Sequence, residues 1–227
     1  MANPKTMAAP SSRERSRDAD RSRESILDAA EQLFADRGYE ATSLTEIGME
    51  AGVSRATPGY FFGSKAELYE AVLDRSFADV RAAVRSGRQR AQSGVHAPEA
   101  VLAGALRDYH DFLSARPNFV RLMEREALGH SPSGADVSPR LAAGQEALSA
   151  ISEELGLAAA DSDEAAHLLL SIVALCWFPI VHGSTLLRSI GLDPKAPGFA
   201  ATRKKHIVDL VLHGVAHRLR RPGHAAN

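Results

Sequence analysis

The amino-acid sequence predicts an all-α fold, with a small N-terminal helical domain followed by a larger helical domain. Apolar side chains recur at the three- and four-residue spacing of amphipathic helices from Ile26 onward, and no segment alternates convincingly with the two-residue period of a half-buried strand. Serines followed three residues later by glutamate mark helix starts, and glycines and prolines mark helix ends. Hydrophobic residues make up 44% of the 227 residues, enough for a sizeable core.

The charge balance and the single cysteine limit the kinds of protein this can be. The 27 Lys and Arg residues are offset by 28 Asp and Glu residues, and a formal net charge of -1 argues against bulk coating of nucleic acid. A small DNA-reading face remains compatible with this balance, because local charge decides such binding. Cys176 is the only cysteine, which excludes an intrachain disulfide and favours a reducing compartment.

Neither a secretory signal nor a membrane span is predicted. The first 22 residues contain no apolar segment of the kind found in signal peptides. The most apolar run, residues 168–181, has 14 residues, whereas a membrane span needs about 20. We therefore expect a soluble cytoplasmic protein with no membrane partner.

The first clear helix follows a polar N-terminal segment. Residues 1–20 mix Arg, Ser, Asp and Pro without periodicity, which predicts a disordered tail. Acids interrupt the arginines of this tail, so a solvated segment is favoured over a DNA-binding arm. Apolar residues from Ile26 to Phe34 then form the stripe of a helix. Gly38 suits the left-handed position after its end, and Tyr39 is expected to pack back on Phe34.

The next two helices are predicted to form a helix-turn-helix. Ser43 and Glu46 make a capping box that starts a helix, and this helix ends at Gly52, which can adopt the positive φ that lets the chain reverse. Ser54 is a good N-cap for the following helix, and the small Gly48 lets the two helices approach closely. This is the geometry of a DNA-binding helix-turn-helix, although an ordinary helical hairpin has the same spacing.

Several side chains of this segment have the chemistry that DNA requires. In a helix-turn-helix, the start of the second helix faces base edges in the major groove. Arg55 is placed where a guanidinium can pair with guanine O6 and N7. Thr57, Tyr60 and Lys65 are donors suited to phosphates, which set the register without reading sequence. A second capping box at residues 64–67 then opens a long helix.

Residues 25–73 resemble the N-terminal domain of the TetR family of transcriptional regulators over their whole length. The matching positions, in family order and spacing, are residues 26–30, 33–34, 38–39, 51–54 and 64–65, with Thr42, Ile47, Tyr60 and Phe62. The resemblance implies a DNA-binding domain over residues 21–81, with its helix-turn-helix at about 43–62, and a ligand-binding and dimerisation domain over 82–227. It also implies base contacts from Thr45, Ser54 and Arg55, and contacts to the DNA backbone from Ser43, Thr57, Tyr60 and Lys65.

One departure from the family pattern falls in the second helix of this motif. The family usually places leucine or a similar residue and then tyrosine before Tyr60, where this chain has Pro58 and Gly59. Pro58 has no amide hydrogen and Gly59 is a poor helix former, so we expect this helix to be locally distorted.

The larger domain is predicted to contain two helices with more apolar surface than one face can hold. The helix over 161–190 is apolar on all sides, so it should be enclosed by the core or a partner, and Pro179 should kink it. The last helix also has surplus apolar surface. Together these two helices predict a two-fold homodimer through a four-helix bundle, which the resemblance also implies. The helices of this domain are expected at 98–115, 118–128, 140–155, 161–190 and 199–220, with loops at 129–139 and 191–198.

Large apolar side chains of this domain are candidates to line a ligand cavity, although such residues more often form plain core. An apolar or aromatic small molecule fits this lining best. The candidates are Tyr109, Phe112, Phe119, Met123, Trp177 and Phe178.

Metal binding and catalysis have weaker support. His213 and His217 have the i, i+4 spacing of a chelating pair, but no nearby acid or cysteine completes a ligand set, so no metal or other cofactor is predicted. The sequence has no nucleotide-binding, serine hydrolase or zinc protease motif. Cys176 lies in an apolar run, where a thiol is unreactive. An enzyme is therefore disfavoured.

The resemblance implies a sequence-specific regulator of transcription. Its partners would be double-stranded operator DNA, a small-molecule effector and a second copy of the chain. The family favours a repressor that the effector releases from its operator, present in the cytoplasm and associated with the nucleoid when bound to DNA. A transcriptional activator, or a helical protein-interaction module with a vestigial helix-turn-helix, is the alternative.

Overall fold

The computed structural model describes residues 12–92, 97–128, 138–157 and 162–219. These residues form helices joined by short turns and contain no strand, which confirms the all-α prediction. The helices are α1 (Ser12–Arg37), α2 (Leu44–Glu50), α3 (Thr57–Phe62), α4 (Lys65–Gln92), α5 (Pro98–Ala115), α6 (Pro117–Ala127), α7 (Ser138–Leu155), α8 (Ser162–Val181), α9 (Leu186–Ser189) and α10 (Phe199–Leu219).

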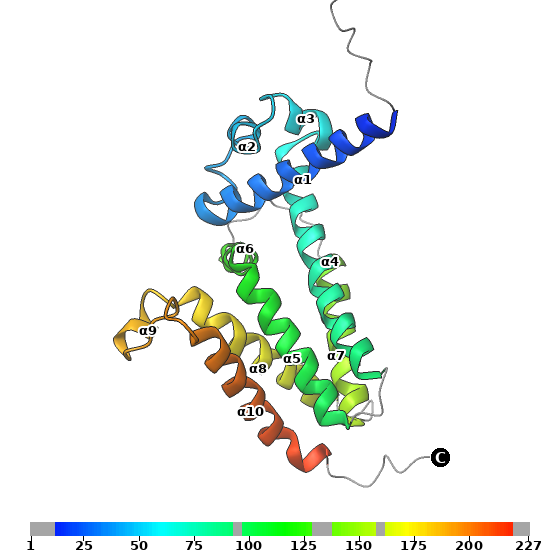
Figure 1. Ribbon diagram of the computed structural model, residues 1–227, viewed down its shortest axis with the longest axis vertical. Helices are drawn as coiled ribbons and strands as arrows, with labels where there is room; N and C mark the ends of the chain where they lie inside the picture. The colour runs from blue at the N-terminus through cyan, green and yellow to red at the C-terminus, as the bar shows by residue number, and fades with distance from the viewer. Residues whose placement is uncertain (1–11, 93–96, 129–137, 158–161, 220–227) are drawn as a thin grey trace, which may run out of the picture.

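Helices α1, α2 and α3 lie together at one end of the molecule, and α4 runs from this end into the larger body (Figure 1). An aromatic cluster joins α1 to α4: the ring centroid of Tyr69 lies 5.0 Å from that of Phe34 and 5.2 Å from that of Tyr39. Gly38 has a φ of 87°, and Tyr39 stacks on Phe34 at 5.9 Å, as predicted for the end of α1. The small domain is thus packed directly on the first turns of α4.

The body is built around α5, which contacts α4, α7, α8 and α10. Helix α6 lies between the body and the small domain, because it packs on α1 as well as on α5 and α8. Buried side chains form one continuous core through both parts of the molecule, and Phe119 of α6 is at most 1% exposed within it. A displacement of α6 or α4 would therefore change the packing of both the small domain and the larger body.

Two predicted boundaries near the ends of helices were wrong. Residues 12–20, predicted as part of a disordered tail, form the first turns of α1, whereas residues 1–11 lie outside the described part of the chain. The helix predicted over 161–190 ends at Val181 and is followed by a turn and the short α9. Pro179 weakens the last turn of α8, because it cannot donate to the Leu175 carbonyl, which accepts instead from Arg203 Nη2 of α10 over 3.0 Å.

Helix α8 is not enclosed by the core of its own chain. Only Ala165, Ile172 and Cys176 of its described side chains are buried, while Leu170 is 64% exposed and Phe178 is exposed as well. By length and composition alone, residues Asp163–Val181 could cross a membrane, with a mean hydropathy of 1.8. The chain by itself therefore leaves much of the apolar surface of this helix uncovered.

Candidate DNA-binding face and ligand cavity

Helix α2 begins at the predicted capping box. The Ser43 hydroxyl accepts from the Glu46 amide over 3.2 Å, and the Ser43 amide donates to the Glu46 carboxylate over 2.9 Å. The hydrogen bonds from Ser43 hold the pKa of Glu46 below its usual value, with a smaller contribution from Arg37. The second capping box, at Ser64, is also present and starts α4. Both predictions from the Ser–Glu spacing are confirmed.

The turn between α2 and α3 depends on two glycines. Gly52 has a φ of 68°, a conformation that other residues rarely adopt. A Cβ on Gly48 would lie 3.0 Å from the carbonyl oxygen of Ser54 and 3.3 Å from the Cα of Arg55, so only glycine lets the turn lie this close to α2. The predicted close approach at Gly48 is therefore confirmed.

Helix α3 starts two residues later than predicted. Ser54 does not cap it, because its hydroxyl is hydrogen-bonded to that of Thr57 at 2.7 Å, and Ala56 occupies the N-cap position. Pro58 consequently lies in the first turn, where helix amides have no partner, so it costs no hydrogen bond. The expected distortion at Pro58 and Gly59 is absent, since both residues lie inside α3 and the positive φ comes only at Gly63.

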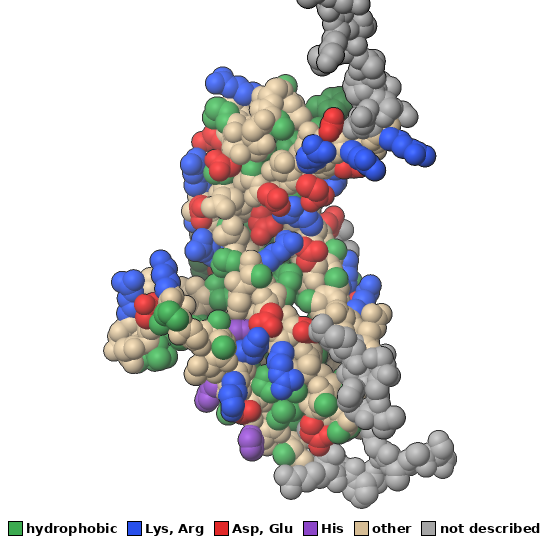
Figure 2. Space-filling model, viewed as in Figure 1, with side chains coloured by type: hydrophobic (Ala, Val, Ile, Leu, Met, Phe, Trp, Pro, Cys, Tyr) green, Lys and Arg blue, Asp and Glu red, His purple; other side chains and the backbone are tan. Residues whose placement is uncertain are grey.

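Most of the side chains predicted to bind DNA face solvent. Ser43, Thr45, Ser54, Arg55 and Tyr60 are exposed, the last to 85%, whereas Thr57 and Lys65 are partly buried. In Figure 2, Lys and Arg side chains of the visible face are interspersed with Asp and Glu. No large area of a single charge sign stands out on this visible face, in agreement with the net charge of -1.

Lys65 has a structural role that its sequence position did not reveal. Its ammonium donates to the carbonyl oxygen of Tyr39 over 3.0 Å and lies 4.2 Å from the centre of the Tyr39 ring. These contacts join the start of α4 to the end of α1. A Lys ammonium has three donors, so this arrangement leaves capacity for a phosphate oxygen.

A cavity of about 230 Å³ lies within the larger domain, between α4, α5, α6, α7 and α8. Of the predicted candidates, Tyr109, Phe119 and Trp177 line it and Phe112, Met123 and Phe178 do not. The other lining residues are Phe77, Val80 and Val84 of α4, Leu102, Ala105 and Leu106 of α5, Ala143, Gly144, Ala147, Ala150 and Ile151 of α7, and Leu169, Ile172 and Val173 of α8.

The three candidates outside the lining have other surroundings. Phe112 packs edge-on against Phe119 at 5.9 Å, Met123 is buried in the core, and Phe178 is exposed beside His182. The lining from α7 was missed because its small residues did not resemble a binding site. Their recurrence at positions 143, 144, 147, 150 and 151 is nevertheless the stripe of one helix face and was visible in the sequence.

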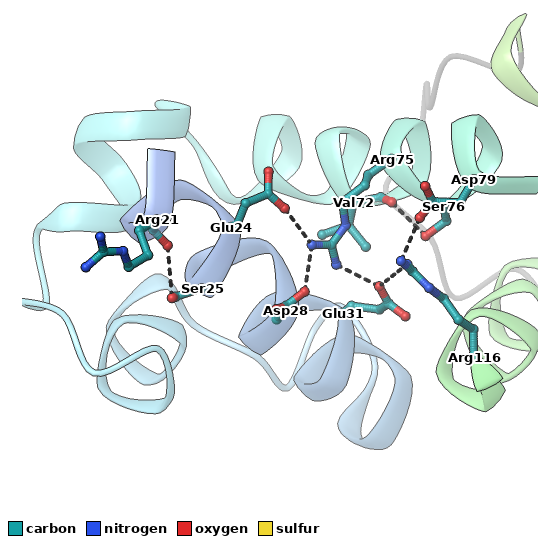
Figure 3. Close-up of polar contacts among 10 residues, drawn as sticks. All are labelled: Arg21, Glu24, Ser25, Asp28, Glu31, Val72, Arg75, Ser76, Asp79 and Arg116. Atoms are coloured by element: carbon teal, nitrogen blue, oxygen red, sulfur yellow. Dashed lines mark hydrogen bonds and ion pairs between the residues drawn. The ribbon is translucent and has the colours of Figure 1, made fainter. Parts of the chain in front are cut away.

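A polar network joins α1 to α4 and to the start of α6 (Figure 3). The Arg75 guanidinium of α4 contacts Asp28 at 2.7 Å and Glu31 at 2.8 Å, both on α1. Burial alone would lower the pKa of Arg75, but hydrogen bonds to these two carboxylates raise it above its ordinary value. Arg116, which precedes α6, lies 3.7 Å from the same Glu31 and 2.7 Å from Asp79 of α4. Glu31 is thus shared by Arg75 of α4 and by Arg116, which lies between α5 and α6.

A second contact between α6 and α1 involves backbone atoms. Arg125 Nε donates to the Ala35 carbonyl over 2.8 Å, and its Nη2 donates to the Asp36 carbonyl over 2.7 Å. These are carbonyls of the last turn of α1, which have no partner within the helix. Helix α6 therefore lines the cavity through Phe119 and caps the end of α1 through Arg125.

Metal and thiol chemistry find little support in the described residues. They contain no group of three or more His, Cys, Asp or Glu side chains that could hold a metal ion. Of the predicted histidine pair, His213 Nδ1 lies 2.6 Å from the Asp209 carbonyl oxygen, and the side chain of His217 is outside the described part. Burial raises the pKa of the Cys176 thiol to about 11, which keeps it protonated.

Comparison with known sequences and structures identifies both parts of the chain. The family profile described as "Bacterial regulatory proteins, tetR family" matches residues 26–72, and the one described as "Tetracyclin repressor-like, C-terminal domain" matches residues 98–211. The HTH-type transcriptional activator FasR of Mycolicibacterium smegmatis is 42% identical over 85 residues, which cover 34% of this chain and 39% of FasR. The chain thus matches less than half of the length of that relative.

Solved structures of regulators share the fold over most of its length. The putative transcriptional regulator SCO4942 of Streptomyces coelicolor is 20% identical, with a TM-score of 0.63 and coverage of 85% of this chain and 97% of that one. The ketosteroid transcriptional regulator KstR2 of Mycobacterium tuberculosis is 18% identical, with a TM-score of 0.62 and coverage of 85% and 93%. With profiles matching both its helix-turn-helix domain and its larger helical domain, the chain belongs to the TetR family of bacterial regulatory proteins.

Proposed function

We propose that this protein is a cytoplasmic, homodimeric transcriptional repressor that binds operator DNA and leaves it when a small apolar effector enters the cavity. One observation carries the proposal: α4 and α6 both line an apolar cavity and both bond to the small domain that holds the helix-turn-helix. A ligand that fits one position of these helices better than another would shift the DNA-binding helices with them. Nothing in this arrangement requires catalysis, and members of the family act as regulators.

The proposed DNA contacts follow from exposure and position. Arg55, with Thr45 and Ser54, is proposed to approach base edges. Ser54 and Arg55 are exposed just before α3, and Thr45 is exposed in the first turn of α2. The proposed phosphate contacts come from Ser43, Thr57, Tyr60 and Lys65.

The uncovered apolar surface supports the dimer. Leu170 of α8 and Leu210 of α10 are 64% and 49% exposed, on two helices that contact each other. Apolar surface of this extent is commonly buried by a partner. A two-fold dimer through these helices would also match the symmetry of a palindromic operator.

The test is binding to the DNA that flanks the gene for this protein. We expect saturable binding in a gel shift that random DNA competes poorly. Arg55→Ala should weaken the best site by about 1–3 kcal/mol and relax discrimination at one or two base positions. Lys65→Ala should weaken binding to all DNA sequences alike. It should also reduce the slope of log K against the logarithm of the salt concentration by about 1. An unchanged order of sequence preference in Arg55→Ala would contradict the placement of the DNA-reading side chains.

Activation is the second candidate, because FasR is named a transcriptional activator. A reporter gene behind the bound DNA separates the two functions. Repression predicts that deletion of the regulator raises expression, and activation predicts that it lowers expression. The DNA-binding measurement has the same expected outcome in both cases.

A further inference from the structure

The cavity offers very little for a ligand to hydrogen-bond. Of the described side chains that line it, only those of Tyr109 and Trp177 contain a polar atom, and none is charged. Trp177 Nε1 donates to the Tyr109 hydroxyl oxygen over 2.8 Å. The indole donor is therefore already used within the protein.

One polar hydrogen remains for a ligand. The Tyr109 hydroxyl accepts from Trp177, and its own hydrogen has no acceptor among the described residues. Burial raises the pKa of this hydroxyl, against a smaller opposite effect of Trp177, so the group stays protonated at neutral pH. The hydrogen bond that it accepts polarises the O–H and makes it a stronger donor. A donor that faces an apolar cavity without an acceptor is costly, and a ligand acceptor would remove that cost.

We propose, on the basis of the proposed effector function, that the cavity takes an uncharged apolar compound with one carbonyl group, a ketone or an ester, whose oxygen accepts from Tyr109. A carbonyl brings acceptors and no donor of its own, so it matches a site that offers a single donor. A carboxylate is disfavoured, because no cationic side chain of the described residues lines the cavity to offset the loss of its hydration. The volume of about 230 Å³ restricts the ligand to a small molecule.

Three ligands of matched chain length test this recognition in the wild-type protein. They are 2-octanone, octane and octanoic acid at neutral pH, titrated while the fluorescence of Trp177, the only tryptophan, is recorded. We expect 2-octanone to bind about 5- to 10-fold more tightly than octane, as one hydrogen bond implies, and octanoate to bind more weakly than both. Equal affinities for ketone and alkane, preference for octanoate, or binding of none of the three would each overturn the proposal.

Two variants locate the preference. Tyr109→Phe alone would free the Trp177 indole N–H, which lines the same cavity, so it is combined with Trp177→Phe. This double variant removes both donors of the described lining, and the advantage of 2-octanone over octane, measured by calorimetry in this variant and in the wild type, should fall to about 1-fold. Phe119→Leu changes the lining without touching a polar atom and should weaken both ligands alike. Equal loss for both ligands in the double variant would overturn the role of the hydroxyl. Operator binding is measured on the same preparations: its absence contradicts the proposed function, whereas operator binding without ketone preference contradicts only this inference.

Discussion

At the scale of single residues, Gly48 controls how closely the helix-turn-helix can pack. A Cβ would meet two backbone atoms, the Ser54 carbonyl oxygen and the Arg55 Cα, and the Cδ of the Pro58 ring, and none of these can rotate away. Gly48→Ala should therefore push the turn from α2, and the overpacking should outweigh the gain in helix propensity by about 1 kcal/mol of unfolding free energy. Because Arg55 moves with the turn, operator affinity should also fall.

Gly59→Ala is the matched control for that substitution. A Cβ there would meet only the Leu44 Cδ1 atom, at 3.9 Å, an ordinary contact. Inside α3, this change should raise the free energy of unfolding, by up to about 1 kcal/mol. Denaturant unfolding of the two variants gives the comparison, and equal effects of both substitutions would show that the turn does not depend on close approach at Gly48.

His110 gives the stability of the larger domain a dependence on pH. It is 7% exposed, its Nδ1 lies 3.4 Å from the Ser114 hydroxyl, and burial lowers its pKa. Asp111 opposes this shift, whereas Lys204 and Arg203 of α10 add to it. As the pH falls below about 6.5, the unfolded chain takes up this proton before the folded chain does, so the free energy of unfolding decreases.

The substitution His110→Gln isolates this contribution. Measured between about pH 7.5 and 5.5, the loss of stability should be smaller in the variant than in the wild type, because the buried titrating group is gone. The other histidines are common to both proteins and cancel in the difference. A variant that loses as much stability as the wild type over this range would show that His110 titrates as it does in the unfolded chain.

At the scale of helices, α6 is positioned to transmit ligand binding to α1. Arg125 bonds two carbonyls at the end of α1, whereas Arg121 of the same helix makes an exposed ion pair with Asp36 at 3.1 Å. Arg125→Gln should reduce the factor by which ligand weakens operator binding, by about 2- to 30-fold. Arg121→Gln should change it little, because exposed ion pairs contribute about 0–1 kcal/mol. Operator affinity measured with and without ligand, in each variant, supplies the factor.

Sequence patterns predicted some helix boundaries correctly, whereas others depend on tertiary contacts. The bounds of α5 were predicted because Pro98 opens it and Pro117 ends the run, both local effects. The end of α8 was not predicted, because it depends on contacts between residues far apart in the sequence. The Leu175 carbonyl, which Pro179 leaves without a helical donor, accepts from Arg203, 28 residues away, and Gly183 packs on Pro194. The proline in the sequence predicts a local kink, but it does not show which distant residues contact the end of the helix.

The candidate site shows the same division. The capping boxes and the turn at Gly52 follow from local chemistry, and the structure has them as predicted. Half of the predicted cavity residues lie elsewhere, because large apolar side chains are equally suited to the core. The packing of five helices decides which of these side chains line the cavity. The periodicity of any one helix does not contain this information.

At the scale of the whole molecule, the exposed apolar faces of α8 and α10 predict a dimer. Light scattering at micromolar concentration should give twice the mass of the 227-residue chain. A stable dimer of this kind is expected to bury at least about 1,000 Å² of surface in total. Leu170→Glu combined with Leu210→Glu should give monomers, because two charges would be buried in each half of the interface. Leu141→Glu, at a position on α7 that is 58% exposed, is the control and should remain dimeric. A monomeric wild type would contradict the proposed assembly.

A dimer makes the coupling between cavity and DNA a property of the whole assembly. The two small domains must match adjacent major grooves, whose spacing is set by the DNA at about 34–36 Å. In such a dimer, movement of α4 and α6 in each subunit would change the separation of the two α3 helices, so one mismatch would remove contacts at both half-sites. A factor of about 5–150 in operator affinity is the usual size of such coupling.

Thermodynamic linkage lets this coupling be measured from the side of the ligand. If ligand weakens operator binding by a given factor, operator DNA must weaken ligand binding by the same factor. Trp177 lines the cavity, so its fluorescence reports ligand affinity directly in the absence and presence of saturating operator. We expect the two affinities to differ by the factor found in DNA titrations, and Arg125→Gln to bring them closer together. Equal ligand affinities in the wild type would show that occupation of the cavity does not control the DNA-binding domain.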